Sequence, residues 1–365
     1  MLFKMIKYYL KLKFVFDFAL ILKFVFNFTL EIMDIKFKTK VGGYMFNKRF
    51  RKTVLFLALA LFFTTVAGCG AKKVDSAKAK ENGNTKTENA SEKKVIYTTF
   101  FPVYDLTKRI VGDKYIVKTI IKGNQEPHDF ELQAKDMADI GKANLIVYNG
   151  AKMESFIDSL KGVAKDDNKF LDLSQGLTLL QGKGDDDNKH ENVNPHTWLS
   201  VKNAMVELDT IYKKVSSMDP KNQEYYKKNY DKALKEFKAL DKKFEKTLSK
   251  VPEDQRYFVV SHAAFNYLAN DYKLKQVAVT GISPEDEPSA KQLKTIADFV
   301  KKHHITTVLF EGKATPKVAE TLAKNTGTKT DSIYTMESLT DKEIKMGYLK
   351  LMEKNLDVLM KSFKR

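Results

Sequence analysis

Short apolar or β-branched runs alternate with amphipathic stretches along residues 95–365, and this order predicts strands that alternate with helices. The run 144–148 (Asn-Leu-Ile-Val-Tyr) is almost continuously apolar, as is typical of a strand covered on both faces of a parallel sheet. The pattern therefore predicts an α/β fold with parallel-type sheets. Strands are expected at 95–100, 116–121, 144–148, 170–173, 257–261, 275–280, 306–310 and 328–334. Helices are expected at 103–111, 134–143, 154–162, 201–216, 263–270, 289–302, 316–326 and 341–363.

One further stretch, 220–250, has apolar residues at steps of three and four and charged or amide residues elsewhere, which predicts a long amphipathic helix. Asp219 is a suitable N-cap, and Pro220 is tolerated in the first turn. At 1.5 Å per residue the helix would be about 45 Å long. It is expected to link a β/α lobe at 95–219 to a second one at 251–365. The alternative is a surface helix of a single domain.

The N-terminal part of the chain has the pattern of a targeting sequence. Residues 45–52 are basic, residues 53–65 are apolar, and Val-Ala-Gly-Cys ends the run at Cys69. This resembles a bacterial lipoprotein signal peptide at 45–68, which is cut before Cys69 so that Cys69 carries the lipid. The protein is then expected on the extracytoplasmic face of the cell membrane. A transmembrane anchor is the alternative, but the apolar run is short for a hydrocarbon core of about 30 Å.

Residues 1–44 form a low-complexity mixture of Phe, Leu, Ile and Lys ahead of a complete signal sequence. Gly42 and Gly43 would be encoded by purine-rich codons just before Met45, as a ribosome-binding site would be. We therefore expect translation to begin at Met45, with 1–44 a mis-called start. Residues 69–94 are mostly polar and cannot bury enough apolar surface to fold, so they are expected to form a flexible tether.

The composition argues against a nucleic-acid-binding protein and against sites built from cysteines. The formal net charge is +17, and about half of the basic excess lies in residues 1–69. The other Lys residues are scattered over predicted helices, without the clustered Arg and aromatic residues of a nucleic-acid-binding surface. Cys69 is the only cysteine, which excludes an intrachain disulfide and a thiolate metal cluster.

Three histidines are predicted to lie at strand ends. His262 follows a strand, His128 lies in a strand-to-helix loop, and His196 precedes a helix. Open α/β sheets bind ligands beyond the carboxyl ends of their strands, so these residues predict a site between the two lobes. Three imidazoles and one carboxylate would complete a tetrahedral zinc site. Spacing alone leaves Glu311 and Glu337 both open as the carboxylate.

Five short motifs occur in order along residues 95–365. They are Thr-Phe-Phe-Pro-Val-Tyr at 99–104, Glu-Pro-His-Asp-Phe-Glu at 126–131, Asn-Pro-His-Thr-Trp-Leu-Ser at 194–200, Ser-His-Ala-Ala-Phe-Asn-Tyr-Leu at 261–268 and Ser-Pro-Glu at 283–285. Together they resemble the motifs of the zinc and manganese solute-binding lipoproteins of bacterial ABC importers, and the likeness covers residues 95–365. The resemblance implies two lobes joined by the long helix. Because such a helix is stiff, we expect only modest closure on metal binding.

The resemblance also implies the ligands and the partners. The implied zinc ligands are His128, His196, His262 and Glu337. Glu337 is favoured because Met-Glu-Ser-Leu-Thr at 336–340 matches the zinc-type motif. Manganese-type members carry a carboxylate in place of His262, so zinc is the expected ion. The implied partners are an ABC permease and its ATPase subunit. The protein is expected to act as a monomer and not as an enzyme.

The sequence also allows other functions, and it differs from the family pattern at two points. A manganese- or iron-delivering member of the same family is one alternative, and a zinc-dependent hydrolase with Glu311 as general base is another. A surface adhesin role is compatible with transport. The acidic loop 184–192 is a short relative of a His-rich loop found in many zinc-type members, and its single histidine, His190, is a secondary candidate ligand. With Cys69 alone, the disulfide that pins one lobe in some relatives is absent.

Overall fold

The computed structural model describes residues 94–182, 193–311 and 316–364, and all of them belong to one compact unit. The predicted signal peptide, the predicted lipidation site Cys69, the predicted tether up to residue 93 and His190 lie outside the described ranges. Within those ranges, no helix combines the length and the apolar character needed to cross a membrane.

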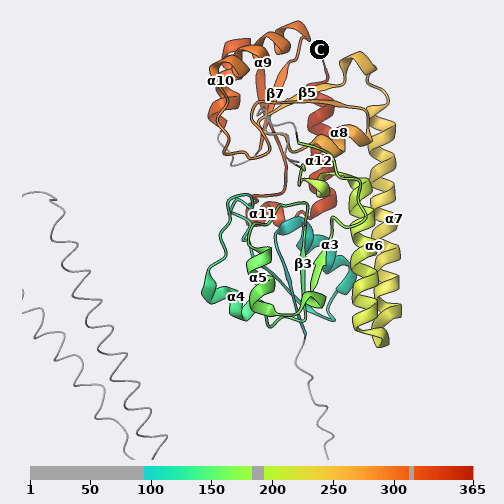
Figure 1. Ribbon diagram of the computed structural model, residues 1–365. Helices are drawn as coiled ribbons and strands as arrows, with labels where there is room; N and C mark the ends of the chain where they lie inside the picture. The colour runs from blue at the N-terminus through green and yellow to red at the C-terminus, as the bar shows by residue number, and fades with distance from the viewer. Residues whose placement is uncertain (1–93, 183–192, 312–315, 365) are drawn as a thin grey trace, which may run out of the picture. The chain divides into compact units, whose positions relative to one another are not determined.

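The N-terminal lobe is built on a four-stranded parallel sheet of order β2-β1-β3-β4. All four residues of β3 are buried, as the apolar run at 144–148 predicted. Helices α3, α4 and α5 connect or follow the strands (Figure 1). The elements are β1 Val95–Thr98, α3 Phe101–Val111, β2 Ile116–Thr119, α4 Ala134–Ile140, β3 Leu145–Tyr148, α5 Ile157–Ala164 and β4 Phe170–Asp172.

The C-terminal lobe repeats this arrangement, with a parallel sheet of order β6-β5-β7-β8. The predicted α/β fold with two parallel sheets is therefore confirmed. Ser289 begins α9 with a capping box that it shares with Gln292. The elements are β5 Tyr257–Val260, α8 Asn266–Asp271, β6 Lys275–Ala278, α9 Ala290–Lys302, β7 Thr307–Glu311, α10 Pro316–Thr326, β8 Lys329–Ile333, α11 Asp341–Ile344 and α12 Tyr348–Ser362.

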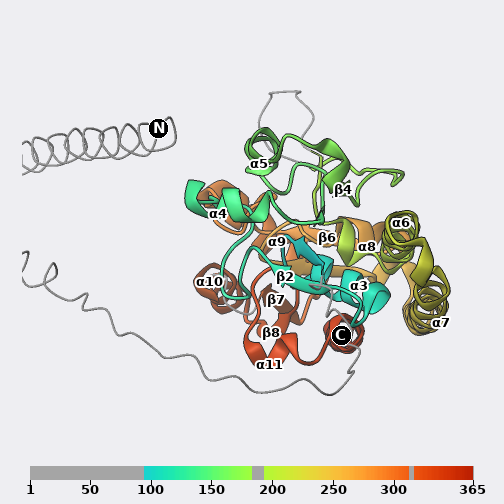
Figure 2. The same cartoon turned by 90° about the horizontal axis from the view of Figure 1, so that it is seen from below.

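The predicted long helix is confirmed as α7, Gln223–Leu248, and it lies beside α6, Val201–Met218 (Figures 1 and 2). Its 26 residues correspond to about 39 Å. Near its start, Tyr226 meets Tyr115 of the N-terminal lobe, and near its end Phe244 stacks on Tyr272 of the C-terminal lobe. The apolar stripe of α7 thus packs against both lobes.

Two local predictions were wrong. The C-terminal segment expected as one helix at 341–363 is interrupted between α11 and α12 at Gly347, whose φ of 78° is left-handed and incompatible with a continuous α-helix. Asp219 does not cap α7. Its carboxylate instead accepts hydrogen bonds from the Tyr226 hydroxyl and the Asn222 amide, and the chain enters α7 through the 3₁₀ turn Pro220–Asn222.

The two lobes share one apolar core near their junction. Trp198, from the segment before α6, is 1% exposed, and its indole N–H donates to the Thr335 carbonyl oxygen of the C-terminal lobe at 2.7 Å. The Tyr348 hydroxyl donates to the Trp198 carbonyl oxygen. These contacts, together with α7, hold the lobes in a fixed relation because separating them would expose apolar surface and break buried hydrogen bonds.

Candidate metal centre

Four side chains from both lobes converge at the carboxyl ends of the strands. His128 lies in the loop between β2 and α4, and His196 lies just before the 3₁₀ turn Thr197–Leu199. His262 follows β5, and Glu337 follows β8. Their candidate ligand atoms all lie within 4.8 Å of one another. The structure therefore brings together the residues that the sequence analysis singled out.

The spacing of these atoms suits a small ion at their centre. His196 Nε2 lies 3.2 Å from Nε2 of both His128 and His262. Glu337 Oε1 lies 3.0 Å from Nε2 of His128 and His196, and its Oε2 lies 3.5 Å from His262 Nε2. A tetrahedron with zinc–nitrogen bonds of 2.0 to 2.1 Å has edges of about 3.4 Å. The observed separations are close to these edges.

Asn194 orients the His196 ring. The Asn194 amide nitrogen donates to the Ala263 carbonyl oxygen at 2.7 Å, so its Oδ1 is the accepting end. That oxygen lies 2.8 Å from His196 Nδ1, which must then carry the proton. The lone pair of Nε2 consequently faces the cluster, as a metal ligand requires. This role of Asn194 was not predicted from the sequence, although an Asn two residues before a candidate ligand was the available signal.

Glu311 lies outside the four-residue cluster and faces the other side of the His262 ring. Its Oε1 is 3.2 Å from His262 Nδ1, a distance typical of an ion pair, although the contact lacks hydrogen-bond alignment. The other carboxylate oxygen of Glu311 accepts a hydrogen bond from Ser261. A carboxylate behind a histidine in this way holds the ring and raises its basicity.

Burial and mutual charge set the protonation of the cluster. Burial by itself raises the pKa of Glu337, but the surrounding imidazoles hold it well below its usual range. Burial lowers the pKa of His196 to about 4. Burial also opposes the charged form of His262, but Glu311 and Glu337 outweigh it and raise its pKa to about 9. Glu337 likewise raises the pKa of His128 above its ordinary value despite burial. Without a metal ion, Glu311 and Glu337 therefore favour the protonated form of His262, and Glu337 favours that of His128.

The loop that carries His128 is in direct backbone contact with the segment that carries Glu337. The Gly123 carbonyl oxygen accepts a hydrogen bond from the Leu339 N–H. A Cβ added at Gly123 would lie 2.6 Å from Ile344 Cδ1 and 2.8 Å from the Leu339 oxygen. Only glycine permits this close approach.

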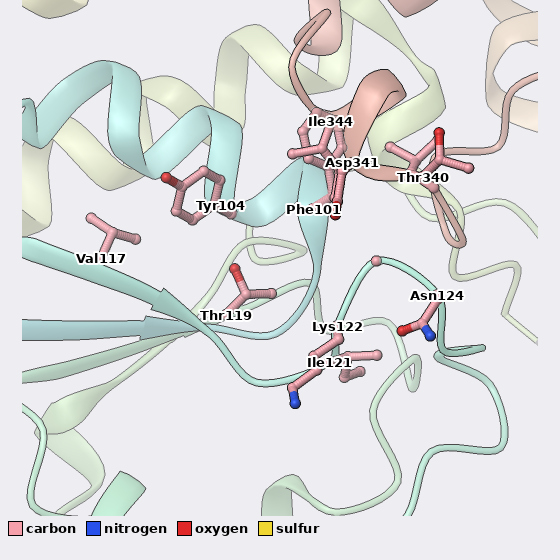
Figure 3. Close-up of a pocket in the computed structure, with 12 residues that line it drawn as sticks. Phe101, Tyr104, Val117, Thr119, Ile121, Lys122, Asn124, Thr340, Asp341 and Ile344 are labelled. Carbon is pink, nitrogen blue, oxygen red and sulfur yellow. The ribbon is translucent and has the colours of Figure 1, made fainter.

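A cleft opens beside this contact, with residues 119–124 on one side and residues 339–344 on the other (Figure 3). None of the four clustered side chains lines it. The clustered atoms are themselves too close together to leave room for anything larger than an ion. The cleft is thus a neighbour of the candidate metal centre and not a part of it.

This chain is similar to proteins named for zinc uptake or zinc binding. The family described as zinc-uptake complex component A, periplasmic (ZnuA), matches residues 96–362. The high-affinity zinc uptake system protein ZnuA of Bacillus subtilis (strain 168) is 36% identical over 329 residues, which cover 86% of this chain and 98% of that protein. The zinc-binding lipoprotein AdcA of Streptococcus pneumoniae serotype 4 is 39% identical over 74% of this chain and 56% of AdcA. The chain thus spans about half the length of AdcA.

Solved structures agree with this. The Zn(II)-bound ZnuA-like domain of S. pneumoniae AdcA is 37% identical, with a TM-score of 0.65 over 75% of this chain and all of that domain. The laminin-binding protein Lmb of Streptococcus agalactiae, described as bifunctional with adhesin and metal-transporting activity, is 33% identical. Its TM-score is 0.66 over 74% of this chain and all of Lmb.

The breadth of the family match and the extent of the identity to B. subtilis ZnuA lead to one assignment. The chain belongs to the ZnuA family of zinc-uptake complex components.

Proposed function

We propose that this protein captures zinc outside the cytoplasm and delivers it to an ABC-type permease with its ATPase subunit. The observation that supports this most directly is the group of four ligand atoms within 4.8 Å, drawn from both lobes of a ZnuA-family fold. In the proposal, zinc is the cargo of the protein. Lipid on Cys69 anchors the protein to the membrane, and the chain acts as a monomer.

The proposed ligands are His128, His196, His262 and Glu337. Three neutral imidazoles and one carboxylate form a donor set that suits zinc better than manganese, which prefers oxygen ligands. The buried position of Glu337, whose side chain is 2% exposed, supports a fixed ligand because a buried carboxylate requires a compensating charge.

The release of zinc to the permease is proposed to involve local rearrangement of loops, with little rotation of the lobes. The apolar stripe of α7 and the contacts of Trp198 support this, because both resist a change in the angle between the lobes. The segments proposed to separate are the loop of His128 and the segment of Glu337, which come from different lobes, meet through the hydrogen bond from Leu339 to Gly123 and border the cleft.

The same geometry argues against the hydrolase alternative. A catalytic zinc site keeps one position open for water, with a general base beside it. In the proposed site the Glu337 carboxylate is the fourth ligand, and Glu311 lies behind His262 at its Nδ1 side. Glu311 is therefore badly placed to activate a zinc-bound water.

The decisive experiment is isothermal titration of the metal-stripped protein, from residue 70 onward, with Zn²⁺ and with Mn²⁺. We expect one tight zinc site, much weaker manganese binding, and a marked loss of zinc affinity in His262→Ala and in Glu337→Ala. His304→Asn is the matched control, because His304 is exposed and Asn tolerates its left-handed φ of 53°. Zinc affinity that is unchanged in His262→Ala would mean that the C-terminal lobe does not supply the site.

A further inference from the structure

A second polar cluster lies behind His196, away from the metal centre, and it is wholly buried. It consists of Asn149 at the end of β3, Thr197 beside His196, and Glu207 on α6, which are exposed by 1%, 0% and 1%. Neither the sequence motifs nor the proposed zinc ligands account for a buried glutamate at this place. Among the described residues, no basic side chain forms an ion pair with Glu207.

The hydrogen bonds of this cluster can be satisfied in only one way. The Asn149 amide nitrogen donates to the carbonyl oxygens of Gly150 at 3.0 Å and Pro195 at 2.8 Å, so Asn149 Oδ1 is an acceptor. Thr197 Oγ1 lies 3.0 Å from that oxygen and must give it the single hydroxyl proton. Thr197 Oγ1 also lies 3.0 Å from Glu207 Oε1 and has no second proton to offer. The proton of this last hydrogen bond must therefore come from Glu207.

We infer that Glu207 is a neutral carboxylic acid that positions the proposed zinc ligand His196, by donating a hydrogen bond to Thr197 in a relay that continues to Asn149 and the Pro195 carbonyl. The effect of Glu207 on zinc affinity rests on the proposed function. The protonation state of Glu207 is independent of that function. The unpaired position of Glu207 favours the neutral form, because an isolated buried charge is costly. Burial raises the pKa of Glu207 to about 8, which agrees.

The relay holds the backbone on both sides of His196. Asn149 binds the Pro195 carbonyl on the N-terminal side, and the Thr197 side chain is held on the C-terminal side. Asn149 is itself fixed, because its backbone N–H donates to Glu154 Oε1 at 2.8 Å. The His196 ring thus takes its position from the end of β3 and from α6. If Glu207 no longer donates its proton, the buried Thr197 hydroxyl oxygen, next to the proposed ligand His196, loses this hydrogen bond.

The neighbouring hydroxyls do not replace Glu207 as donor. The Tyr267 hydroxyl donates to the Asn194 carbonyl oxygen at 2.7 Å, and the Tyr348 hydroxyl donates to the Trp198 carbonyl oxygen. Both protons are thus committed to other backbone groups that surround His196. Among the described residues, Glu207 is thus the hydrogen-bond partner of the Thr197 hydroxyl that can donate a proton to it.

The test compares Glu207→Gln with Glu207→Leu. Glutamine keeps a neutral donor of the same shape, so zinc affinity is expected to stay within about threefold of that of the unaltered protein. Leucine keeps the volume and removes the donor, and its zinc affinity should fall by about tenfold, the lower end for partners that orient metal ligands. Thr197→Val should weaken zinc binding to a similar extent, whereas Thr197→Ser, which keeps the hydroxyl, should not. The double variant Glu207→Leu with Thr197→Val should bind zinc only slightly more weakly than either single variant, because both changes break the same chain of hydrogen bonds.

A measurement on the metal-free protein separates this inference from the proposed function. The infrared spectrum at pH 7 should contain the carbonyl band of a protonated carboxylic acid that Glu207→Gln removes. Absence of that band, or a Glu207→Gln protein that binds zinc as weakly as Glu207→Leu, would overturn the inference. So would a Glu207→Leu protein with lowered melting temperature and unchanged zinc affinity, since Glu207 would then serve folding only. If His262→Ala leaves zinc binding intact, the proposed ligand set fails, while the infrared band still reports the proton on Glu207.

Discussion

The dependence of zinc affinity on pH follows from the charges in the metal-free cluster. Imidazole must be neutral to bind zinc, so each ligand that is an imidazolium has to lose one proton when the ion arrives. The pKa of His262 is raised to about 9 and that of His128 is also raised, whereas that of His196 is lowered to about 4. The zinc affinity is therefore maximal only above the raised pKa values of His262 and His128, and it decreases as the pH falls through them.

The size of the effect can be worked out from His262. At pH 7 its pKa of about 9 lies two units higher, so the loss of its proton reduces zinc affinity about a hundredfold, or about 3 kcal/mol. Each further unit of acidification costs another factor of about ten through His262. His128 adds a second proton below its own raised pKa, whereas His196 stays neutral above pH 4. Between pH 7.5 and 5.5 the apparent affinity should fall by at least about a hundredfold.

The assay is competition with a chelator of known zinc affinity at pH 7.5, 6.5 and 5.5. Calorimetry at pH 6.5 in two buffers of different ionisation enthalpy then counts the protons released, and we expect between one and two per zinc ion. His304→Asn should leave both results unchanged, because His304 is an exposed residue. Zinc affinity that stays constant from pH 7.5 to 5.5 would refute a site made of three histidines.

Three further predictions concern neighbouring parts of the structure. Glu311→Gln removes a charge that raises the pKa of His262, so the pH dependence of zinc affinity should be shallower above pH 7, and affinity should fall by no more than about a hundredfold. The chelator assay extended upward from pH 7.5 checks this, and an unchanged slope there would contradict it. Gly123→Ala should lower the free energy of unfolding by about 1 to 3 kcal/mol and weaken zinc binding, because its Cβ has no room. The control Gly162→Ala, with open space around it in α5, should stabilise the protein by up to about 1 kcal/mol in urea denaturation. Phe244→Ala should cost about 3 to 5 kcal/mol in the same measurement, since this side chain of α7 is fully buried, and a loss below about 1 kcal/mol would show that α7 does not bind the lobes together.

The order of strands and helices could be predicted from the sequence because it depends on local periodicity. The stripe of α7 repeats every three to four residues, and β3 is an unbroken apolar run. The break at Gly347 was missed, because an isolated glycine can be tolerated in a helix and only the packed backbone reveals its left-handed φ. Asp219 was misread as a cap for a related reason. The Asp219 carboxylate accepts a hydrogen bond from the hydroxyl of Tyr226, which lies seven residues further along the chain.

The sequence by itself was enough to predict the candidate ligands, because His128, His196 and His262 follow or precede predicted strands and helices at positions where α/β sheets bind ligands. Tertiary structure alone decided how they are arranged. The difference between Glu337 inside the cluster and Glu311 behind His262 is a matter of a few ångströms between strands far apart in the chain. Such separations depend on how two lobes pack against one helix, and local sequence patterns carry no information about distances of this kind.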